Sequence, residues 1–450
     1  MPDRLQPSVI ARPAPTNVRW LIFVLACAAS WLLYLHRYSW GIIKPAFREE
    51  FPDIGDVEIG WLDSAFLILY GAGQIPTGVL GDLIGPRIVL TVSVFVWSLT
   101  TVGVAWTSGF WNIFAARAGF GLAQAGAYPI ISKITRVWFP LATRTTVQGV
   151  VTAMGRVGAA FAPLIIASLL MGLLDMSWQT SLLILTLPGF GLAVAVWICL
   201  RNRPAEHPWV NSTEREMIAD TPPPALSQDQ SAIREGEPPL RPVPTKVPFL
   251  QLGWASGLSL AMMFLYVFAS TFQDQFYVNW LPSYLREGAG FDVTMMGLLT
   301  PLPLLGGAVG GVIGGILNDW LIARTGNRRW SRSGVAFAGK FLAACMVMLS
   351  LQFEAGWVTV AVLVAARVFN DWSLPTQWAA VTDMGGRAAA TLFGIVNTIG
   401  AIGGVAAGPI LGYLKREYDW PGIFYGVAAM CLAAALTWLF LDCTKRVVGD

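Results

Sequence analysis

Long apolar runs alternate with short polar breaks along almost the whole chain. A membrane-spanning helix needs about 20 consecutive, mostly apolar residues, and about twelve runs of this length are present. They cover residues 20–44, 58–81, 87–107, 111–138, 144–173 and 178–200, and then 252–284, 294–323, 333–352, 357–383, 389–414 and 420–442. The pattern predicts an all-α membrane protein with twelve transmembrane helices in two sets of six.

A polar stretch separates the two sets. Residues 201–248 contain ten of the 28 prolines, together with serine, glutamine and charged residues. Because such a composition buries little apolar surface, it is predicted to be a linker without a packed core. The predicted organisation is a tail at 1–19, a six-helix half at 20–200, the linker at 201–248, a second half at 249–442 and a tail at 443–450.

The composition agrees with a protein dissolved in lipid. Hydrophobic residues make up 55% of the chain and charged residues only 13%, and the mean hydropathy is +0.58, whereas a soluble domain is about one quarter charged. A net charge of +3 is too small to suggest a nucleic-acid partner. Five cysteines without a CxxC pair and two histidines predict no metal site, and no motif suggests a cofactor or an enzyme active site.

Lysine and arginine predict the orientation, because they gather in cytoplasmic loops. If the N-terminus is cytoplasmic, the loops and tails on that side hold 20 of the 30 basic residues and the outer loops hold 5. Both termini and the linker are therefore expected in the cytoplasm, in a multi-pass protein of the cell membrane.

The two sets resemble one another. Residues 59–82 and 296–319 match at seven positions, which include Gly78/Gly315 and Asp82/Asp319. A second pair, 149–158 and 394–403, follows in the same order. Two parallel repeats are expected, with a binding site between them near the middle of the membrane.

A glycine-rich turn carries charged residues at matching places in both repeats. The set comprises Gly78, Asp82 and Arg87 in the first half and Asp319, Arg328 and Arg329 in the second. Glycine allows two helices to approach closely, and an aspartate at a helix end can pair with arginine and with helix-terminal amides. The cluster is predicted to lock one face of the protein and to release it. It resembles the loop signature of the major facilitator superfamily, which implies twelve helices and alternating access.

Further motifs resemble the anion:cation symporters of that superfamily, which carry sugar acids, phthalate-type acids and sialic acids. They are Tyr34-Leu-His36-Arg37, Ala65-Phe66 with Tyr70, Arg117 through Gln124 to Tyr128-Pro129, Trp280-Leu-Pro282-Ser-Tyr284, and Gly394 with Asn397. The resemblance implies transport of a small organic anion. Many members carry carboxylates as proton carriers where this chain has His36 and Gln124, so the usual carriers are missing.

Charged residues at membrane depth are costly and need a partner or a wet cavity. Arg37 and Arg117 lie on polar helix faces and are expected to bind a carboxylate, because guanidinium forms two parallel hydrogen bonds with it. Arg156 is as well suited to a structural ion pair as to binding. Other candidate contacts to the substrate are Tyr34, Tyr70, Gln124, Gln377, Trp378 and Asn397.

Three residues remain as candidate proton carriers. Asp371 has Arg367 one helical turn away, which favours its ionised form. Asp274 has no basic residue within a turn of its own helix, and His36 titrates near neutrality, so these two rank ahead of Asp371. A carrier that exchanges anions without moving a proton or another cation is the alternative.

The sequence therefore predicts a monomeric secondary active transporter for a small organic anion, such as a sugar acid or an aromatic acid. An organophosphate antiporter or facilitator is the second reading. A membrane sensor with a transporter fold is the third.

Overall fold

The computed structural model describes residues 13–54, 56–106, 109–219, 253–291, 293–353 and 355–447. All regular structure in these ranges is helical, in accord with the all-α prediction. Nine stretches of the described residues are long and apolar enough to cross a membrane. Large side chains such as Leu67, Trp111 and Val405 are exposed on the surface, which suits a protein that faces lipid.

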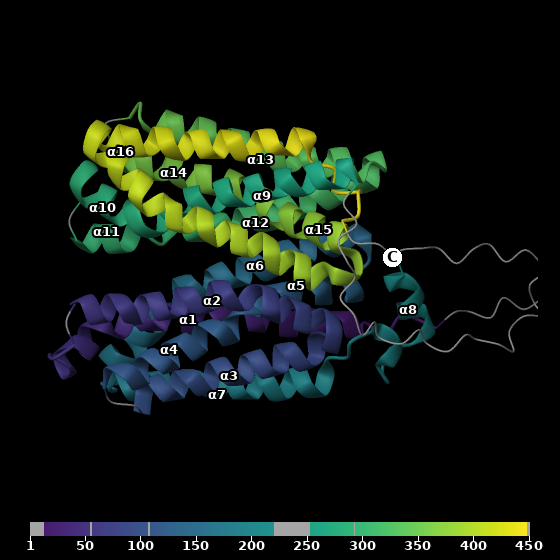
Figure 1. Cartoon of the computed structure of the whole chain (residues 1–450), viewed down its shortest axis with the longest axis horizontal. Helices are drawn as coiled ribbons and strands as arrows, with labels where there is room; N and C mark the ends of the chain where they lie inside the picture. The colour runs from purple at the N-terminus through teal and green to yellow at the C-terminus, as the bar shows by residue number, and fades with distance from the viewer. Residues whose placement is uncertain are drawn as a thin grey trace, which may run out of the picture.

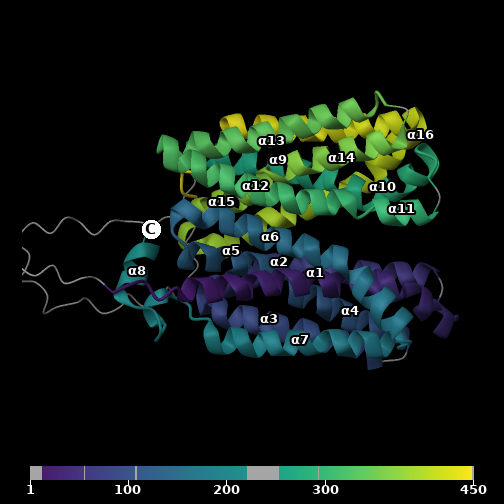
Figure 2. The same cartoon turned by 180° about the vertical axis from the view of Figure 1, so that it is seen from behind.

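The first half of the chain forms one side of the molecule (Figures 1 and 2). We call it the N-half. Its elements are α1 (Val18–Glu50), α2 (Asp56–Ile84), α3 (Pro86–Trp106), α4 (Phe110–Ala125), α5 (Ala127–Trp138), α6 (Leu141–Pro163) with a π-helical extension (Leu164–Leu173), and α7 (Trp178–Cys199).

The second half lies beside it and is called the C-half (Figure 1). It contains α9 (Trp254–Gln275), α10 (Leu281–Ser283) between π-helical turns at Phe276–Trp280 and Tyr284–Gly288, α11 (Val293–Leu299), α12 (Leu302–Thr325), α13 (Arg328–Ser350), α14 (Gly356–Asp371), α15 (Ser373–Gly385) and α16 (Ala389–Phe440). A 3₁₀ turn at Gly386–Ala388 joins α15 to α16.

Helix boundaries follow the polar breaks, with three internal differences from the sequence prediction. The run 111–138 divides at Gly126 into α4 and α5, and the run 357–383 divides at Trp372 into α14 and α15. The runs 389–414 and 420–442 join within α16, where Asp419 has a left-handed backbone with φ of 53°. The apolar pattern predicts how long a membrane-spanning run is, but it does not predict where the helix within the run breaks or bends.

The first part of the predicted linker is folded, which corrects the expectation of an unpacked segment at residues 201–219. This docked segment contains a 3₁₀ turn (Pro204–Glu206) and α8 (Ser212–Ile218). Asn211 caps α8, because its side chain accepts a hydrogen bond from the Glu214 amide at 2.9 Å. Glu214 accepts bonds from the amides of Val18 and Arg19 at the start of α1. The rest of the predicted linker, 220–248, lies outside the described residues.

One end of the bundle carries α8, the start of α1 and the end of α16 (Figures 1 and 2). We call it the terminal face. The two halves pack closely near this end because glycines lie where the helices cross. A Cβ on Gly78 of α2 would lie 2.5 Å from the Ala390 carbonyl oxygen of α16. The repeat-related Gly315 of α12 would meet the Thr145 carbonyl oxygen of α6 at 2.8 Å. Glycine therefore permits both helix crossings.

Candidate functional site

Arg37 lies among aromatic side chains of the N-half. Its guanidinium carbon is 4.5 Å from the ring centre of Tyr70 and 5.1 Å from that of Tyr34, close enough for cation–π attraction. Its Nε donates to Gln124 Oε1 at 3.1 Å, and Gln124 is held in turn by the Leu33 carbonyl. Arg37 Nη2 is buried without a hydrogen-bond partner among the described residues. The structure thus brings Arg37, Tyr34, Tyr70 and Gln124 together, and one charged donor is available.

An aromatic path leads from this site to the C-half. The Tyr34 and Tyr128 rings are 6.1 Å apart, and Tyr128 lies 4.7 Å from the ring of Trp378 on α15. Trp378 packs in turn on Phe393 of α16. Two further residues were predicted to contact the substrate. Gln377, which precedes Trp378 in the sequence, is buried, and Asn397, one helical turn after Phe393, is half-buried.

Arg117 occupies a different environment from Arg37. Its guanidinium group lies over Trp40, Phe66 and Phe120, and Nε donates to the Leu62 carbonyl at 3.4 Å. It lines a cavity of about 20 Å³ inside the N-half, which has room for about one water molecule. Both arginines touch the Phe66 ring. In this conformation, however, the cavity that Arg117 lines is too small for an organic anion.

His36 borders the same cavity. It is almost fully buried, and its Nε2 donates to the Leu185 carbonyl at 2.9 Å. Its Nδ1 lies 3.4 Å from Thr101 Oγ1. Both ring nitrogens therefore face polar groups within the N-half.

A cluster of two arginines and two aspartates joins the halves at membrane depth. Arg156 of α6 lies 2.5 Å from Asp371 of α14, measured from Nη2 to Oδ2. Arg367 bonds Asp274 and lies 3.5 Å from Asp371 Oδ1. Asp274 therefore has a cationic neighbour on another helix, which removes the reason for ranking it above Asp371. A Cβ on Gly307 would lie 2.5 Å from Asp371 Oδ2, so this glycine leaves room for the cluster.

Lys340 extends the cluster within the C-half. Its buried ammonium group donates to Ser270 Oγ at 2.8 Å and to Asn370 Oδ1 at 2.7 Å. Asn370 connects Lys340 to Asp371, because its amide nitrogen donates to Asp371 Oδ1 at 2.9 Å. Sequence analysis singled out Arg156, Arg367, Asp274 and Asp371, but the connection through Asn370 depends on packing.

Two matching contacts, which we call the aspartate latches, join the halves near the terminal face. Asp82 of α2 accepts a 2.7 Å hydrogen bond from the Thr391 amide in the first turn of α16. The repeat-related Asp319 of α12 accepts a 2.7 Å bond from the Thr146 amide in the second turn of α6. The Thr391 amide is the third in α16 and therefore has no acceptor within its own helix, so Asp82 satisfies it. Both aspartates also lie near the positively polarised start of a helix, which stabilises a carboxylate.

The predicted basic partners in this gating motif differ from those in the structure. Asp82 forms an ion pair with Lys133 at 2.8 Å. Arg87, which was expected in the lock, stacks on Trp197 at 4.2 Å and donates to its carbonyl within the N-half. Arg329 pairs with Asp442 at 3.6 Å. Residue spacing could not reveal these pairs because each joins separate segments of the chain.

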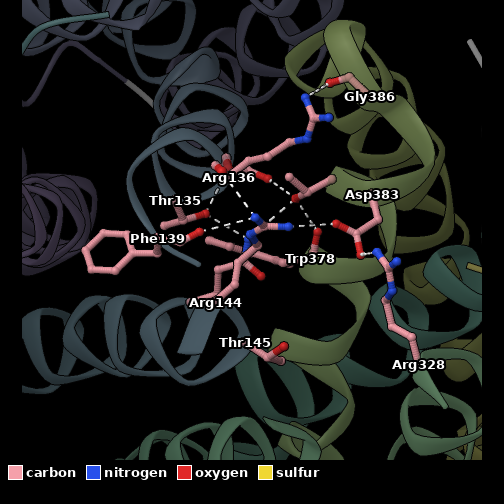
Figure 3. A network of polar contacts seen from close by, with 12 residues as sticks. Thr135, Arg136, Phe139, Arg144, Thr145, Arg328, Trp378, Asp383 and Gly386 are labelled. Atoms are coloured by element: carbon pink, nitrogen blue, oxygen red, sulfur yellow. Dashed lines mark hydrogen bonds and ion pairs between the residues drawn. The ribbon is translucent and has the colours of Figure 1, made fainter. Parts of the chain in front are cut away.

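Asp383 is the centre of a third contact between the halves at the terminal face, which sequence analysis missed. Figure 3 shows its carboxylate between Arg144 of the N-half and Arg328 of the C-half, at 3.0 and 3.2 Å; Arg332 lies at 2.6 Å. Arg144 also donates to the carbonyls of Arg136 and Phe139. The sequence signal, a single aspartate near the end of an apolar run, was too weak to identify this role.

Arg136 adds a further bridge. It donates to the carbonyl of Gly386, which lies in the turn between α15 and α16 (Figure 3). Gly386 has a left-handed backbone with φ of 52°, which glycine adopts without the steric cost of a Cβ. Side chains and backbone thus both join the halves at the terminal face.

Comparison with known proteins identifies relatives over nearly the whole length. The chain is 27% identical to the "Probable sulfoacetate transporter SauU" of Cupriavidus necator, covering 95% of this chain and 94% of that protein. It is 29% identical to the "Probable galactarate/D-glucarate transporter GudP" of Escherichia coli K12, covering 97% and 94%. The "D-galactonate transporter" of E. coli O6:H1 is 24% identical, covering 97% and 98%.

The family model described as the Major Facilitator Superfamily matches residues 20–408. This range contains both aspartate latches, the Arg37 site and the cross-half ion cluster. The relatives are carriers rather than enzymes. The chain is therefore a multi-pass membrane transporter that belongs to the Major Facilitator Superfamily and is related to carriers of small organic anions.

Proposed function

We propose that this protein moves a small organic acid across the membrane by alternating access, with Arg37 as the main anchor for an acid group. The observation that carries the proposal is the buried, unbonded Nη2 of Arg37 within a cluster of aromatic rings. A guanidinium group with one donor committed to Gln124 still offers further N–H groups to a carboxylate or a sulfonate. The relatives named for sulfoacetate, galactarate, D-glucarate and D-galactonate support an acid of this size.

The proposed architecture is twelve transmembrane helices in two parallel repeats. The stretch Gly356–Phe440 has 85 residues, and a straight helix of that length would measure about 128 Å against a hydrocarbon core of about 30 Å. It is therefore assigned three crossings: α14 with α15, and the two parts of α16 on either side of Asp419. α4 with α5 supplies one more crossing.

The conformation described here is proposed to be closed at the terminal face, and that face is proposed to be cytoplasmic. The Asp82, Asp319 and Asp383 contacts all join the two halves near this end. Opening requires all three to break together, which fits a rocking motion of one half against the other. The excess of basic residues in loops and tails assigned to this side supports the orientation.

Binding is proposed to compete with the internal ion pair between Arg156 and Asp371. A substrate that reaches across from Arg37 would offer Arg156 a second anionic or hydroxyl group. Asp371 would then lose its cationic partner at 2.5 Å and keep only Arg367, at 3.5 Å. Asp371 thereby becomes the first candidate for proton coupling, with Asp274 and His36 as the others.

The test of the anchor is substrate binding by Arg37→Lys. Purified protein is screened by thermal shift against sugar acids, sulfonated acids, phosphate esters and neutral sugars, since a ligand specific for the folded state raises the unfolding midpoint. Lysine keeps the charge but loses the planar fork. We expect affinity to fall roughly tenfold to hundredfold, as for the loss of a charged hydrogen bond of about 1.5–3 kcal/mol.

Arg324→Lys is the matched control. Arg324 also lies over an aromatic ring, that of Trp320 at 5.3 Å, but near the end of α12. Its replacement should leave binding unchanged. Wild-type affinity in Arg37→Lys would rule out Arg37 as the anchor, and stabilisation by phosphate esters alone would favour an organophosphate carrier.

The test of coupling is Asp371→Asn in reconstituted vesicles that contain a pH-sensitive dye. Asparagine cannot carry a proton, so we expect substrate binding to persist while substrate-driven proton entry is lost. Asp274→Asn and His36→Gln are measured beside it, with the exposed Asp53→Asn as control. If Asp371→Asn still moves protons with substrate as the wild type does, Asp371 is not the carrier. If the wild type moves none, the protein exchanges anions or follows their gradient.

A further inference from the structure

The docked segment, residues 201–219, forms a preformed wall on the terminal face. Glu214 is fully buried and accepts hydrogen bonds from Thr16, Val18 and Arg19 at 2.6, 3.0 and 3.0 Å. His207 packs edge-on against Trp138, which fixes the other end of the segment to α5. Contacts at both ends hold the segment against the N-half, so the surface between them has a defined shape.

A cavity of about 440 Å³ lies between this segment and the end of α5. Its lining contains three arginines from three places: Arg136 of α5, Arg203 before the 3₁₀ turn, and Arg215 of α8. The other lining residues are Val137, Pro204, Ala205, Ile218 and Ala219. No acidic residue lines the cavity within the described part of the chain. The positive charge of the three arginines therefore favours an anionic ligand.

We propose that this cavity binds a phosphate group. Guanidinium groups match phosphate geometry with paired hydrogen bonds, and a phosphate offers more charge and more acceptor oxygens than a carboxylate. A cavity of this volume falls in the range of about 300–1,000 Å³ that holds small molecules. The phosphate belongs either to the headgroup of an anionic lipid or to a soluble phosphate compound.

The site would stand next to the gate. Arg136 donates to the Gly386 carbonyl of the C-half, and the Arg136 carbonyl accepts from Arg144, the N-half partner of Asp383. Arg136 thus faces the cavity and takes part in closure. The site is separate from the Arg37 anchor and does not depend on which organic acid is carried.

The experiment uses the full chain in nanodiscs of phosphatidylcholine. One arm adds inorganic pyrophosphate at matched ionic strength; the other replaces part of the lipid with phosphatidylglycerol. The readout is the unfolding midpoint for wild type, the double variant Arg203→Gln/Arg215→Gln, and Arg324→Gln as a control arginine outside the cavity. Arg203 and Arg215 are exposed, so the double variant should fold, and its midpoint without ligand verifies this.

We expect at least one probe to stabilise the wild type and Arg324→Gln equally. The double variant should bind that probe about tenfold more weakly, or not at all. A response to phosphatidylglycerol alone assigns a lipid headgroup, and a response to pyrophosphate alone assigns a soluble phosphate. The proposal is overturned if neither probe stabilises the wild type, or if the double variant responds as the wild type does.

Discussion

At the scale of single residues, Asp383 shows how one carboxylate can connect two halves of a membrane protein. Its carboxylate is almost entirely enclosed and faces Arg144, Arg328 and Arg332. Only Arg144 belongs to the other half, so the C-half arginines hold the carboxylate ready and Arg144 completes the contact. Removing one member of a buried pair leaves uncompensated charge, which costs about 3–5 kcal/mol.

Asp383→Asn should therefore open the terminal face. The measurement is labelling of Ser132→Cys in a variant without native cysteines, because Ser132 is buried where its hydroxyl meets Thr382 across the halves, at 2.6 Å. We expect faster labelling in Asp383→Asn. Asp442→Asn is the control, since Asp442 pairs with Arg329 inside the C-half. Equal labelling rates in the two variants would mean that the Asp383 contact does not hold this face shut.

At the scale of elements, sequence and structure agree on the helices whose apolar runs are imposed by the bilayer. Apolar runs predicted the helices because their length is set by membrane thickness. The repeated Gly78, Asp82 and Asp319 of the predicted gating motif lie at contacts between the halves. The docked segment escaped prediction for a physical reason: composition averages over many residues, whereas docking depends on a few, above all Glu214. Lys133 and Asp383 find their partners through tertiary packing, and so does Arg367 in its bond to Asp274, whereas spacing along one helix predicts only the Arg367–Asp371 pair.

The docked segment should respond to pH through His207. Its Nε2 donates to the Cys199 carbonyl at 3.0 Å while Nδ1 accepts from the Trp209 amide at 3.2 Å, a pattern that only the neutral ring provides. Burial lowers the pKa of His207, because desolvation disfavours the charged ring, and the bond to Cys199 offsets this in part. The neutral form thus stabilises docking fully above the unfolded pKa of about 6.5. That contribution is lost as the pH falls through the lower folded value.

Hydrogen exchange of residues 201–219, corrected for the intrinsic rate at each pH, measures this effect. Protection should decrease as the pH falls below about 6.5. His207→Gln has no titrating ring, so its protection should be lower and nearly independent of pH in this range. Protection in the wild type that stays constant down to pH values where imidazole is charged would contradict a role for His207 in docking.

At the scale of the whole molecule, the proposed orientation places the terminal face in the cytoplasm and the opposite end outside the cell. Ser212 is exposed on α8 at the terminal face, and Asp53 is exposed in the turn between α1 and α2 at the other end. In cells that make a variant without native cysteines, Ser212→Cys should react with an impermeant reagent only after the membrane is opened. Asp53→Cys should react in intact cells. The reverse result would place the terminal face outside and overturn the proposed orientation.

The two aspartate latches have a consequence for how the halves recognise one another. Asp82 of the N-half meets a helix start of the C-half, and Asp319 of the C-half meets the matching helix start of the N-half. Each half thus gives the aspartate in one contact and the helix in the other, as in the isologous interface of a two-fold symmetric dimer. Each half consequently carries both the carboxylate and the helix start that receives one. These two contacts are self-complementary, whereas the Asp383 carboxylate that meets Arg144 is supplied by the C-half alone.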